Sequence, residues 1–192
     1  MPKNIKFDEQ LAISKAMDVF WKKGYSGTSM RDITEAIGIN SSSLYNTIGD
    51  KHQLFVKCIK NYTESRIEIA KKQVQNVSSP LSAIEEFINA AAFSITHDPN
   101  SCLAIKTTFE MAIDDPEIKK ILKADSDFTY QIILKLVKSA IEEKEIKMTN
   151  DAEMLTDYII SQFTGWHESF IIHKDISRIK KMSQFLIQQL NQ

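Results

Sequence analysis

The chain has 192 residues, of which 43% are hydrophobic and 26% are charged, and its formal net charge is −1. This length is sufficient for one or two helical domains with a real core, and the near-neutral charge excludes a protein that coats nucleic acid through bulk positive charge. Two cysteines are too few for a disulfide framework or a cysteine-rich metal cluster. No stretch approaches transmembrane length and no secretion signal opens the sequence, so we expect a cytoplasmic protein that does not engage membranes.

Three short helices are predicted in the first fifty residues. Apolar residues between positions 13 and 20 recur with the spacing of one helical face, and Gly24 is suited to end that helix. Thr28 or Ser29 is placed to cap a second helix that ends at Gly38. Asn40 then caps a third helix after a tight break. This arrangement is typical of a helix-turn-helix, which places its second helix in a DNA groove.

The third helix carries the side chains that we expect to read DNA. Its first turn contains three serines, which either cap and solvate that turn or approach phosphates and base edges closely; within a helix-turn-helix we favour the second interpretation. Tyr45 can donate to a phosphate, Asn46 can pair with adenine, and Lys51 begins a fourth helix whose terminus can hold a phosphate. The predicted DNA-binding residues are Thr28, Ser29, Asn40, Ser41, Ser42, Ser43, Tyr45, Asn46 and Lys51.

Charge is distributed unevenly along the chain. Residues 1–60 carry a net charge of +3 and residues 61–192 a net charge of −4. The excess is modest and is compatible with ordinary surface scatter. Its sign is the one that an N-terminal DNA-binding domain needs, because phosphate contacts supply much of the affinity.

The segment that ends at Leu54 resembles the DNA-binding domain of the TetR/AcrR family of bacterial repressors. The residues that match this family's pattern are Phe20, Gly24, Tyr25, Thr28, Ser29, Asp32, Ile33, Ala36, Gly38, Ile39, Ser43, Leu44, Tyr45, Gly49, Lys51 and Leu54. The resemblance implies an all-α fold, with a three-helix DNA-binding head in residues 1–50 and a six-helix effector-binding and dimerisation domain in residues 51–192. It also implies a homodimer that binds double-stranded DNA and is not an enzyme. Ser41 stands where many family members carry a basic residue. We therefore expect this protein to bind an operator whose sequence differs from theirs.

The remainder of the chain predicts six further helices and no clear strand. The first five have expected ranges of about 51–76, 80–96, 102–113, 116–145 and 151–173. The last is expected to start at Asp175 or Ser177 and to end near Leu190. Asn150 and Glu153 have capping-box spacing at the start of the fifth of these. The helix that starts at Lys51 connects the two predicted domains, which makes it the expected mechanical link between them.

The last two helices carry large apolar strips. A monomer core could account for either strip, but both together favour a homodimer, which the resemblance implies to be a four-helix bundle. Gly165 permits a close approach of helices there. The predicted dimerisation residues are Phe163, Trp166, Phe170, Ile171, Met182, Phe185 and Leu186.

Apolar and aromatic residues with few charges occupy the central helices, and they predict a hydrophobic or aromatic small-molecule effector. Such a molecule would shift the linking helix and change the separation of the two reading helices. The candidate effector-binding residues are Tyr62, Phe87, Cys102, Ile105, Phe109, Phe128, Phe163 and Trp166.

Several alternatives to small-molecule control remain open. Cys102 opens a helix, so it is either a small buried hydrophobe or a thiol that senses oxidants or electrophiles. Control by a partner protein is a further possibility. A metal site is not expected, because His167 and His173 are six residues apart and have no second ligand at helical spacing. An all-helical enzyme or carrier is the remote alternative, since no convergent catalytic set is visible, and no cofactor is predicted.

Overall fold

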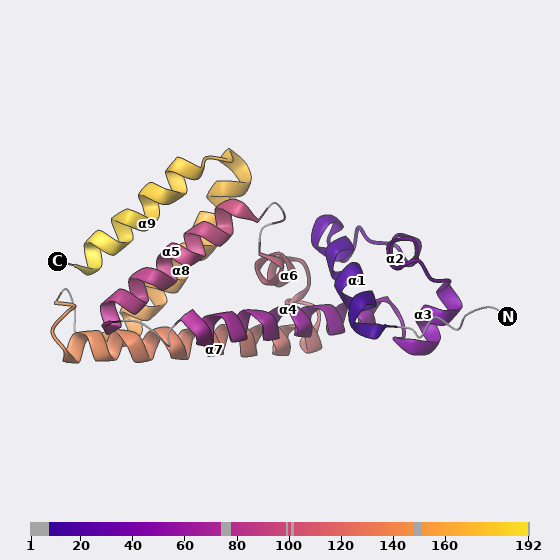
Figure 1. Cartoon of the computed structure of the whole chain (residues 1–192), viewed down its shortest axis with the longest axis horizontal. Coiled ribbons are helices and arrows are strands. Elements are labelled where there is room, and N and C mark those ends of the chain that lie inside the picture. Colours follow the sequence, from indigo (N-terminus) through magenta and orange to yellow (C-terminus); the bar gives the residue numbers. More distant parts are fainter. Residues whose placement is uncertain (1–7, 74–77, 99, 101, 148–150, 192) are drawn as a thin grey trace. The chain divides into compact units, whose positions relative to one another are not determined.

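The computed structural model describes residues 8–73, 78–98, 100, 102–147 and 151–191. These residues form nine α-helices and no strand, which confirms the predicted all-α fold (Figure 1). The helices are α1 (Glu9–Lys23), α2 (Met30–Ile37), α3 (Ser41–Thr47), α4 (Lys51–Gln73), α5 (Pro80–His97), α6 (Leu103–Met111), α7 (Pro116–Glu142), α8 (Ala152–His173) and α9 (Ile176–Leu190).

Polar side chains at the helix starts fix where the helices begin. Ser79 and Asp175 accept backbone hydrogens three residues on, and each caps its helix. Helix α8 is capped by Asp151, whose carboxylate accepts the Met154 amide at 2.9 Å. The predicted cap at Asn150 lies outside the described residues, and the observed cap is one residue further on.

The chain divides into two compact units. The first contains residues 1–63 and 103–122, and the second contains residues 64–102 and 123–192. Helices α4 and α7 each contribute to both units. The predicted boundary at residue 50 divides the chain by function, into a DNA-binding part and an effector-binding part. That boundary stays a prediction.

The first unit is built around aromatic and aliphatic side chains of α1 to α4. Phe20, Ile33 and Leu44 are fully buried and come from α1, α2 and α3 respectively. Phe55 of α4 meets the Phe20 ring edge to face, with ring centroids 4.8 Å apart. The start of α4 therefore belongs to the same core as the helix-turn-helix.

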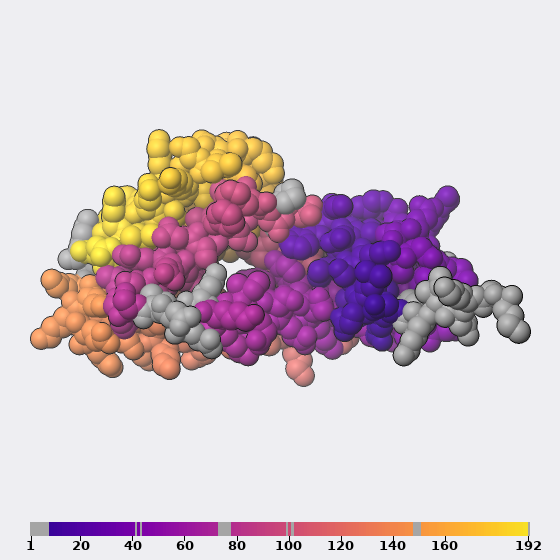
Figure 2. Space-filling view, in the orientation of Figure 1, coloured from indigo at the N-terminus to yellow at the C-terminus, as the bar shows by residue number. Residues whose placement is uncertain are grey.

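The second unit has a core formed by α5, α7, α8 and α9. Figures 1 and 2 show α9 alongside α5, and their surfaces adjoin. Trp166 is 1% exposed and Leu186 is 2% exposed in this core. Both side chains were expected at a subunit interface; they instead pack inside one subunit, because the faces of α8 and α9 that carry them turn toward α5.

No helix in the described ranges combines the length and the apolar character that crossing a lipid bilayer requires.

Candidate nucleic-acid interface

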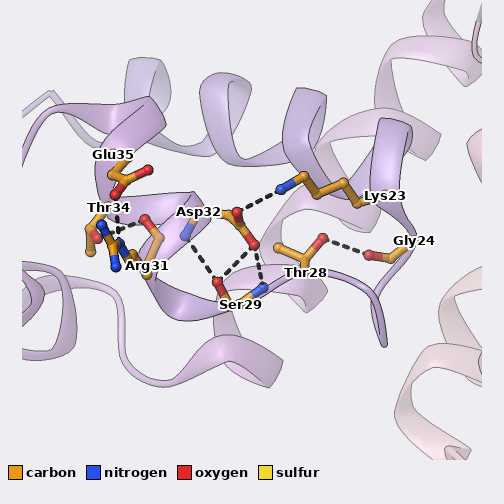
Figure 3. Close-up of polar contacts among 8 residues, drawn as sticks. All are labelled: Lys23, Gly24, Thr28, Ser29, Arg31, Asp32, Thr34 and Glu35. Carbon is orange, nitrogen blue, oxygen red and sulfur yellow. Dashed lines mark hydrogen bonds and ion pairs between the residues drawn. The ribbon is translucent and has the colours of Figure 1, made fainter.

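Helix α2 starts with a complete capping box (Figure 3). The Asp32 amide donates to the Ser29 hydroxyl oxygen at 3.1 Å, and the Ser29 amide donates to the Asp32 carboxylate at 2.8 Å. Lys23 at the end of α1 contacts the same carboxylate at 2.5 Å. The Lys23 ammonium and then the Ser29 amide lower the pKa of Asp32 below its usual range. Of the two candidate caps, Thr28 and Ser29, Ser29 is thus the one that caps α2.

Thr28 has a structural role inside the head. It is 2% exposed, and its hydroxyl donates to the Gly24 carbonyl at 2.6 Å (Figure 3). A side chain so enclosed does not present its hydroxyl to a ligand at the surface. We therefore leave Thr28 out of the proposed DNA contacts and keep it as a residue that shapes the turn before α2.

The turn between α2 and α3 is short and left-handed. Gly38 has φ 84° and ψ 32°, a conformation that glycine adopts without steric cost, and its amide donates to the Thr34 carbonyl at 2.9 Å. Asn40 follows, with its side-chain oxygen accepting the Ser42 hydroxyl at 2.8 Å. The Leu44 amide donates to the Asn40 carbonyl at 3.2 Å, so Asn40 stands at the start of α3 as predicted.

Helix α3 has one buried side and one exposed side. Leu44 is fully buried and Ile48, just beyond the helix, is 5% exposed, so both anchor α3 to the head. Tyr45 is 47% exposed and Asn46 is also exposed, on the side away from the core. The side chains of Ser41 and Ser43, which are also predicted to contact DNA, lie outside the described part of the structure.

A second capping box starts α4. The Gln53 amide donates to the Asp50 carboxylate at 2.8 Å, and the Asp50 amide donates to the Gln53 side-chain oxygen at 3.0 Å. The ammonium group of Lys51 lies 4.3 Å from the centre of the Tyr25 ring, a cation–π contact. The Asp50 carboxylate therefore already accepts an amide hydrogen at this helix terminus, and a phosphate bound there would lie next to that carboxylate. Lys51 would contact such a phosphate from its position over the Tyr25 ring.

Two contacts of α6 with the head have no signal in the local sequence. Glu110 accepts the backbone amides of Tyr25 and Ser26 at 3.0 and 2.8 Å. The Lys106 ammonium donates to the Trp21 carbonyl at 3.0 Å. These partners are 84 or 85 positions apart in the chain, so no periodicity or spacing could have predicted them.

The second unit contains a polar cluster around Arg66 on α4. Its guanidinium lies 3.2 Å from the Asp125 carboxylate and donates to the Cys102 sulfur at 3.5 Å. Burial raises the pKa of Asp125, and the Arg66 charge opposes that rise. Burial, and to a smaller extent Arg66, lowers the pKa of His167 to about 4. Cys58 is a different case, because it is fully buried in the first unit and burial raises the pKa of its thiol to about 12.

The predicted effector-binding residues are divided between the two units. Phe163 lies between Phe87 and Trp166 in the second unit, with ring centroids 5.8 and 5.5 Å apart. Phe128, also in that unit, lies 5.8 Å from the Lys71 ammonium, and Cys102 contacts Arg66. Tyr62, Ile105 and Phe109 belong to the first unit. Phe109 is 72% exposed, which is the opposite of a pocket-lining side chain.

The remaining predicted dimerisation residues are at least partly accessible. Ile171 and Phe185 are 48% and 59% exposed, and Phe163, Phe170 and Met182 are half-buried. Further large apolar side chains on α8 and α9 are also exposed; they are Met154, Tyr158, Ile172 and Ile176.

The sequence of the head matches a known family. Residues 12–58 match the model of the bacterial regulatory proteins of the tetR family. The chain is 30% identical over 129 residues to YezE of Bacillus subtilis (strain 168), an uncharacterized HTH-type transcriptional regulator, and the match covers 66% of each chain. It is 31% identical over 123 residues to the HTH-type transcriptional repressor ComR of Escherichia coli (strain K12), covering 62% of this chain and 58% of ComR. These matches span less than two thirds of the length of either curated relative.

Solved structures extend the likeness of the fold to nearly the whole chain. A TetR transcriptional regulator from Chloroflexus aurantiacus J-10-FL superimposes with a TM-score of 0.88 at 22% identity, covering 96% of this chain and 94% of that one. A cysteine mutant of the TetR family regulator CifR, complexed with 26-bp operator DNA, gives a TM-score of 0.84 at 20% identity, covering 98% and 100%. With the family match to its head, its curated relatives and this shared fold, the chain belongs to the tetR family of bacterial regulatory proteins.

Proposed function

We propose that this protein is a DNA-binding transcriptional regulator that acts as a homodimer and represses its target by occupying a palindromic operator. The observation that carries the proposal is the exposed side of α3, where Tyr45 and Asn46 face away from a core that fixes the helix through Leu44. The operator complex of CifR supports DNA as the partner, and the name of ComR supports repression. The names of YezE and ComR argue against the enzyme or carrier alternative, because both are named as transcriptional regulators or repressors.

We assign different tasks to the two side chains of α3. Asn46 is suited to read adenine in the major groove through its amide, which is a contact that distinguishes bases. Tyr45 is suited to donate to a phosphate, which positions the protein without selecting a sequence. Ser42 and Ser29 are placed at the starts of α3 and α2, where short hydroxyl groups suit phosphate contacts.

The test is fluorescence anisotropy with a labelled fragment of the DNA upstream of the protein's own gene. Asn46→Ala should weaken specific binding roughly 5- to 150-fold and relax preference at one base pair, whereas Tyr45→Ala should weaken all sequences alike. Asn89→Ala, an exposed asparagine on α5, is the matched control and should bind as the parent does. The proposal fails if the parent chain binds this fragment no more tightly than random DNA.

We further propose that a small apolar or aromatic molecule releases the protein from DNA. The three neighbouring rings of Phe87, Phe163 and Trp166 support an aromatic ligand in the second unit. A ligand that favours one separation of the two reading helices over another would change DNA affinity by a coupling free energy of typically about 1–3 kcal/mol. A panel of apolar compounds, scored by a rise in unfolding temperature and by loss of DNA binding, identifies or excludes such a ligand.

Control through Cys102 is a second candidate, which the 3.5 Å contact with Arg66 favours. Reactive cysteines in proteins sit beside cations, as this one does. N-ethylmaleimide, whose alkene carbon accepts the sulfur while the adjacent carbon takes a proton, should then release the DNA from the parent chain and leave Cys102→Ser bound. Release of both proteins to the same extent would eliminate thiol control.

A further inference from the structure

Four residues that are distant in the sequence form a polar cluster within the second unit. They are Arg66 of α4, Cys102 before α6, Asp125 of α7 and His167 of α8. The Arg66 guanidinium lies 3.2 Å from the Asp125 carboxylate and 3.5 Å from the Cys102 sulfur, and its positive charge acts on the imidazole of His167. Helices α4, α7 and α8 thus each contribute one titratable side chain to the cluster.

Most of this cluster is enclosed. The Asp125 side chain and His167 are each 8% exposed, whereas the Arg66 side chain is 37% exposed. An enclosed ion pair is a weak source of stability, since the desolvation of two charges offsets most of their attraction. Buried titratable groups beside a specific charge partner are instead typical of functional sites. Through its exposed part, Arg66 is the member of the cluster that a dissolved molecule can contact first.

The charges of the cluster compensate one another. Arg66 and Asp125 carry opposite charges, and burial, followed by the Arg66 charge, lowers the pKa of His167 to about 4, so its imidazole is neutral at pH 7. A ligand that brought a full charge to the cluster would lose its hydration without gaining a counter-ion, which is costly. The cluster therefore favours an uncharged ligand.

The hydrogen-bond donors and acceptors of the cluster define the polar group that fits it. A guanidinium only donates, a carboxylate only accepts, and a neutral imidazole has one nitrogen of each kind. A hydroxyl group donates one hydrogen bond and accepts two, so it satisfies Arg66 and Asp125 at the same time. An ether oxygen only accepts, and it would leave the Asp125 carboxylate without a donor from the ligand. An uncharged hydroxyl is therefore the matching group.

Aromatic rings accompany the cluster on two of its helices. On α8, Phe163 is four residues before His167 and therefore lies on the same face. The centroid of the Phe163 ring is 5.5 Å from that of Trp166. On α7, Phe128 is three residues after Asp125. A ligand whose hydroxyl lies on the cluster has these rings beside it, which favours an aromatic body for that ligand.

We propose that Arg66, Asp125 and His167 form the polar end of a binding site in the second unit for an uncharged aromatic alcohol of the phenol class. The ligand hydroxyl donates to the Asp125 carboxylate and accepts from the Arg66 guanidinium, while its ring packs on the aromatic side chains of α7 and α8. This inference rests on the proposed release by a small apolar or aromatic molecule, and it deepens that proposal by naming the class of molecule.

Isothermal titration calorimetry of the full chain with three compounds tests the class of ligand. The compounds 2-naphthol, 2-methoxynaphthalene and 2-naphthoate share one ring system and differ in carrying a hydroxyl, an ether or a charged carboxylate. The naphthol should bind roughly tenfold more tightly than either of the others, or better, because it alone donates and accepts without bringing a charge. Equal or tighter binding of the ether or the carboxylate, or no binding of the naphthol, overturns the proposal.

The variant Asp125→Asn tests whether the cluster is the place of binding. It removes the negative charge beside Arg66 and keeps the shape of the side chain. The cluster then has an unbalanced positive charge, so the preference for 2-naphthol over 2-naphthoate should fall roughly tenfold or more. Asp127→Asn, at an exposed carboxylate of the same helix, is the matched control and should keep the parent's preference. A folded Asp125→Asn protein with the parent's preference overturns the site.

The variant Arg66→Gln gives a second test at a more accessible side chain. It removes the guanidinium that donates to the ligand hydroxyl, so the affinity for 2-naphthol should fall roughly tenfold or more. Arg178→Gln changes an exposed arginine on α9 and should bind as the parent does. Unfolding curves report whether each variant is folded. Unchanged affinity in a folded Arg66→Gln protein also overturns the site.

These titrations contain no DNA, so they judge the site separately from the proposed DNA binding. A parent chain that binds 2-naphthol but not the upstream DNA fragment supports the site and overturns the proposed regulator. A chain that binds the fragment but not 2-naphthol overturns the site and leaves the regulator in place. Where both bind, 2-naphthol should weaken binding of the fragment, and a fragment held equally tightly in its presence overturns control through this site.

Discussion

His167 is a polar residue within the apolar second unit, and its surroundings explain its titration. It is 8% exposed on α8, and burial is the main cause that lowers its pKa to about 4, followed by the positive charge of Arg66. An unfolded chain restores an ordinary histidine pKa near 6.5 and therefore takes up a proton more readily than the folded chain. The folded protein thus favours the neutral imidazole of His167 over the protonated one.

The pH dependence of stability follows from this lowered pKa. Since the unfolded state binds the proton first, the contribution of His167 is fully present above about pH 6.5 and is lost as the pH falls toward 4. His167→Gln should remove a slope that amounts to roughly 2–3 kcal/mol of unfolding free energy across this window. Urea unfolding at a series of pH values measures it.

Two further variants serve as controls for this measurement. His173→Gln changes an exposed histidine at the end of the same helix and should keep the parent's slope. Asp125 has a raised pKa, so its contribution to the free energy of unfolding has the opposite sign and is lost as the pH rises through the raised pKa. Asp125→Asn removes this opposing contribution and should therefore make the free energy of unfolding fall more steeply toward acid pH. If His167→Gln unfolds with the parent's pH dependence, His167 is not the group that titrates.

Helix α8 has an exposed stripe that the second unit does not cover. Met154, Tyr158, Gly165 and Ile172 recur on one face at intervals of four and seven residues, and all are exposed. A Cβ built at Gly165 meets nothing within 4 Å, so a neighbouring helix could come close to the backbone there. Contiguous exposed apolar side chains of this kind typically mark an interface.

The proposed homodimer predicts how α8 responds to a bulky residue at Gly165. Gly165→Lys should raise the helix propensity of α8 by roughly 0.5–1 kcal/mol and leave one subunit folded. It should nevertheless weaken dimerisation roughly tenfold or more, because a long charged side chain replaces the closest approach. Analytical ultracentrifugation over a concentration series gives the dissociation constant. Asn89→Lys adds the same charge on α5 and should remain dimeric; equal dissociation constants for the two variants would remove α8 from the interface.

Local physics made most of the elements predictable. Helix starts at Ser29, Asn40 and Pro80 depend on a cap or a ring within a few residues, and these signals are visible in the sequence. The direction that a helix faces depends on its neighbours. Trp166 and Leu186 were assigned to the subunit surface because α8 and α9 carry apolar residues on more than one face, and only packing against α5 decides between faces.

The candidate site was predictable to a similar extent. The division of α3 into buried Leu44 and exposed Tyr45 follows from helical periodicity. The hold of Glu110 on Tyr25 does not, because contacts between residues far apart in the chain depend on the tertiary fold and leave no local pattern. The same holds for the cluster of Arg66 and Asp125, whose positions on α4 and α7 are unrelated in sequence spacing.

At the scale of the whole molecule, the proposed dimer imposes a geometry on its operator. Two reading helices related by a two-fold axis reach half-sites whose centres are about 34–36 Å apart, or a multiple of that. Each subunit places its α3 through a head that shares a core with the start of α4. If α4 connects head and body stiffly, the dimer tolerates one spacing; if it connects them loosely, the dimer tolerates several.

Changing the spacing of the half-sites decides between these cases once footprinting has located the operator. Inserting about 5 bp at its centre turns one half-site to the opposite face of the duplex, and affinity should fall roughly 100-fold or more toward the non-specific level. Inserting about 10 bp restores the face but adds about 34 Å between the centres, and a stiff dimer should bind this DNA equally weakly. Recovery of tight binding with the longer insertion would show heads that move independently. In that case a ligand could not release DNA by changing a fixed separation, and the proposed mechanism of release would have to be replaced by one that acts within each head.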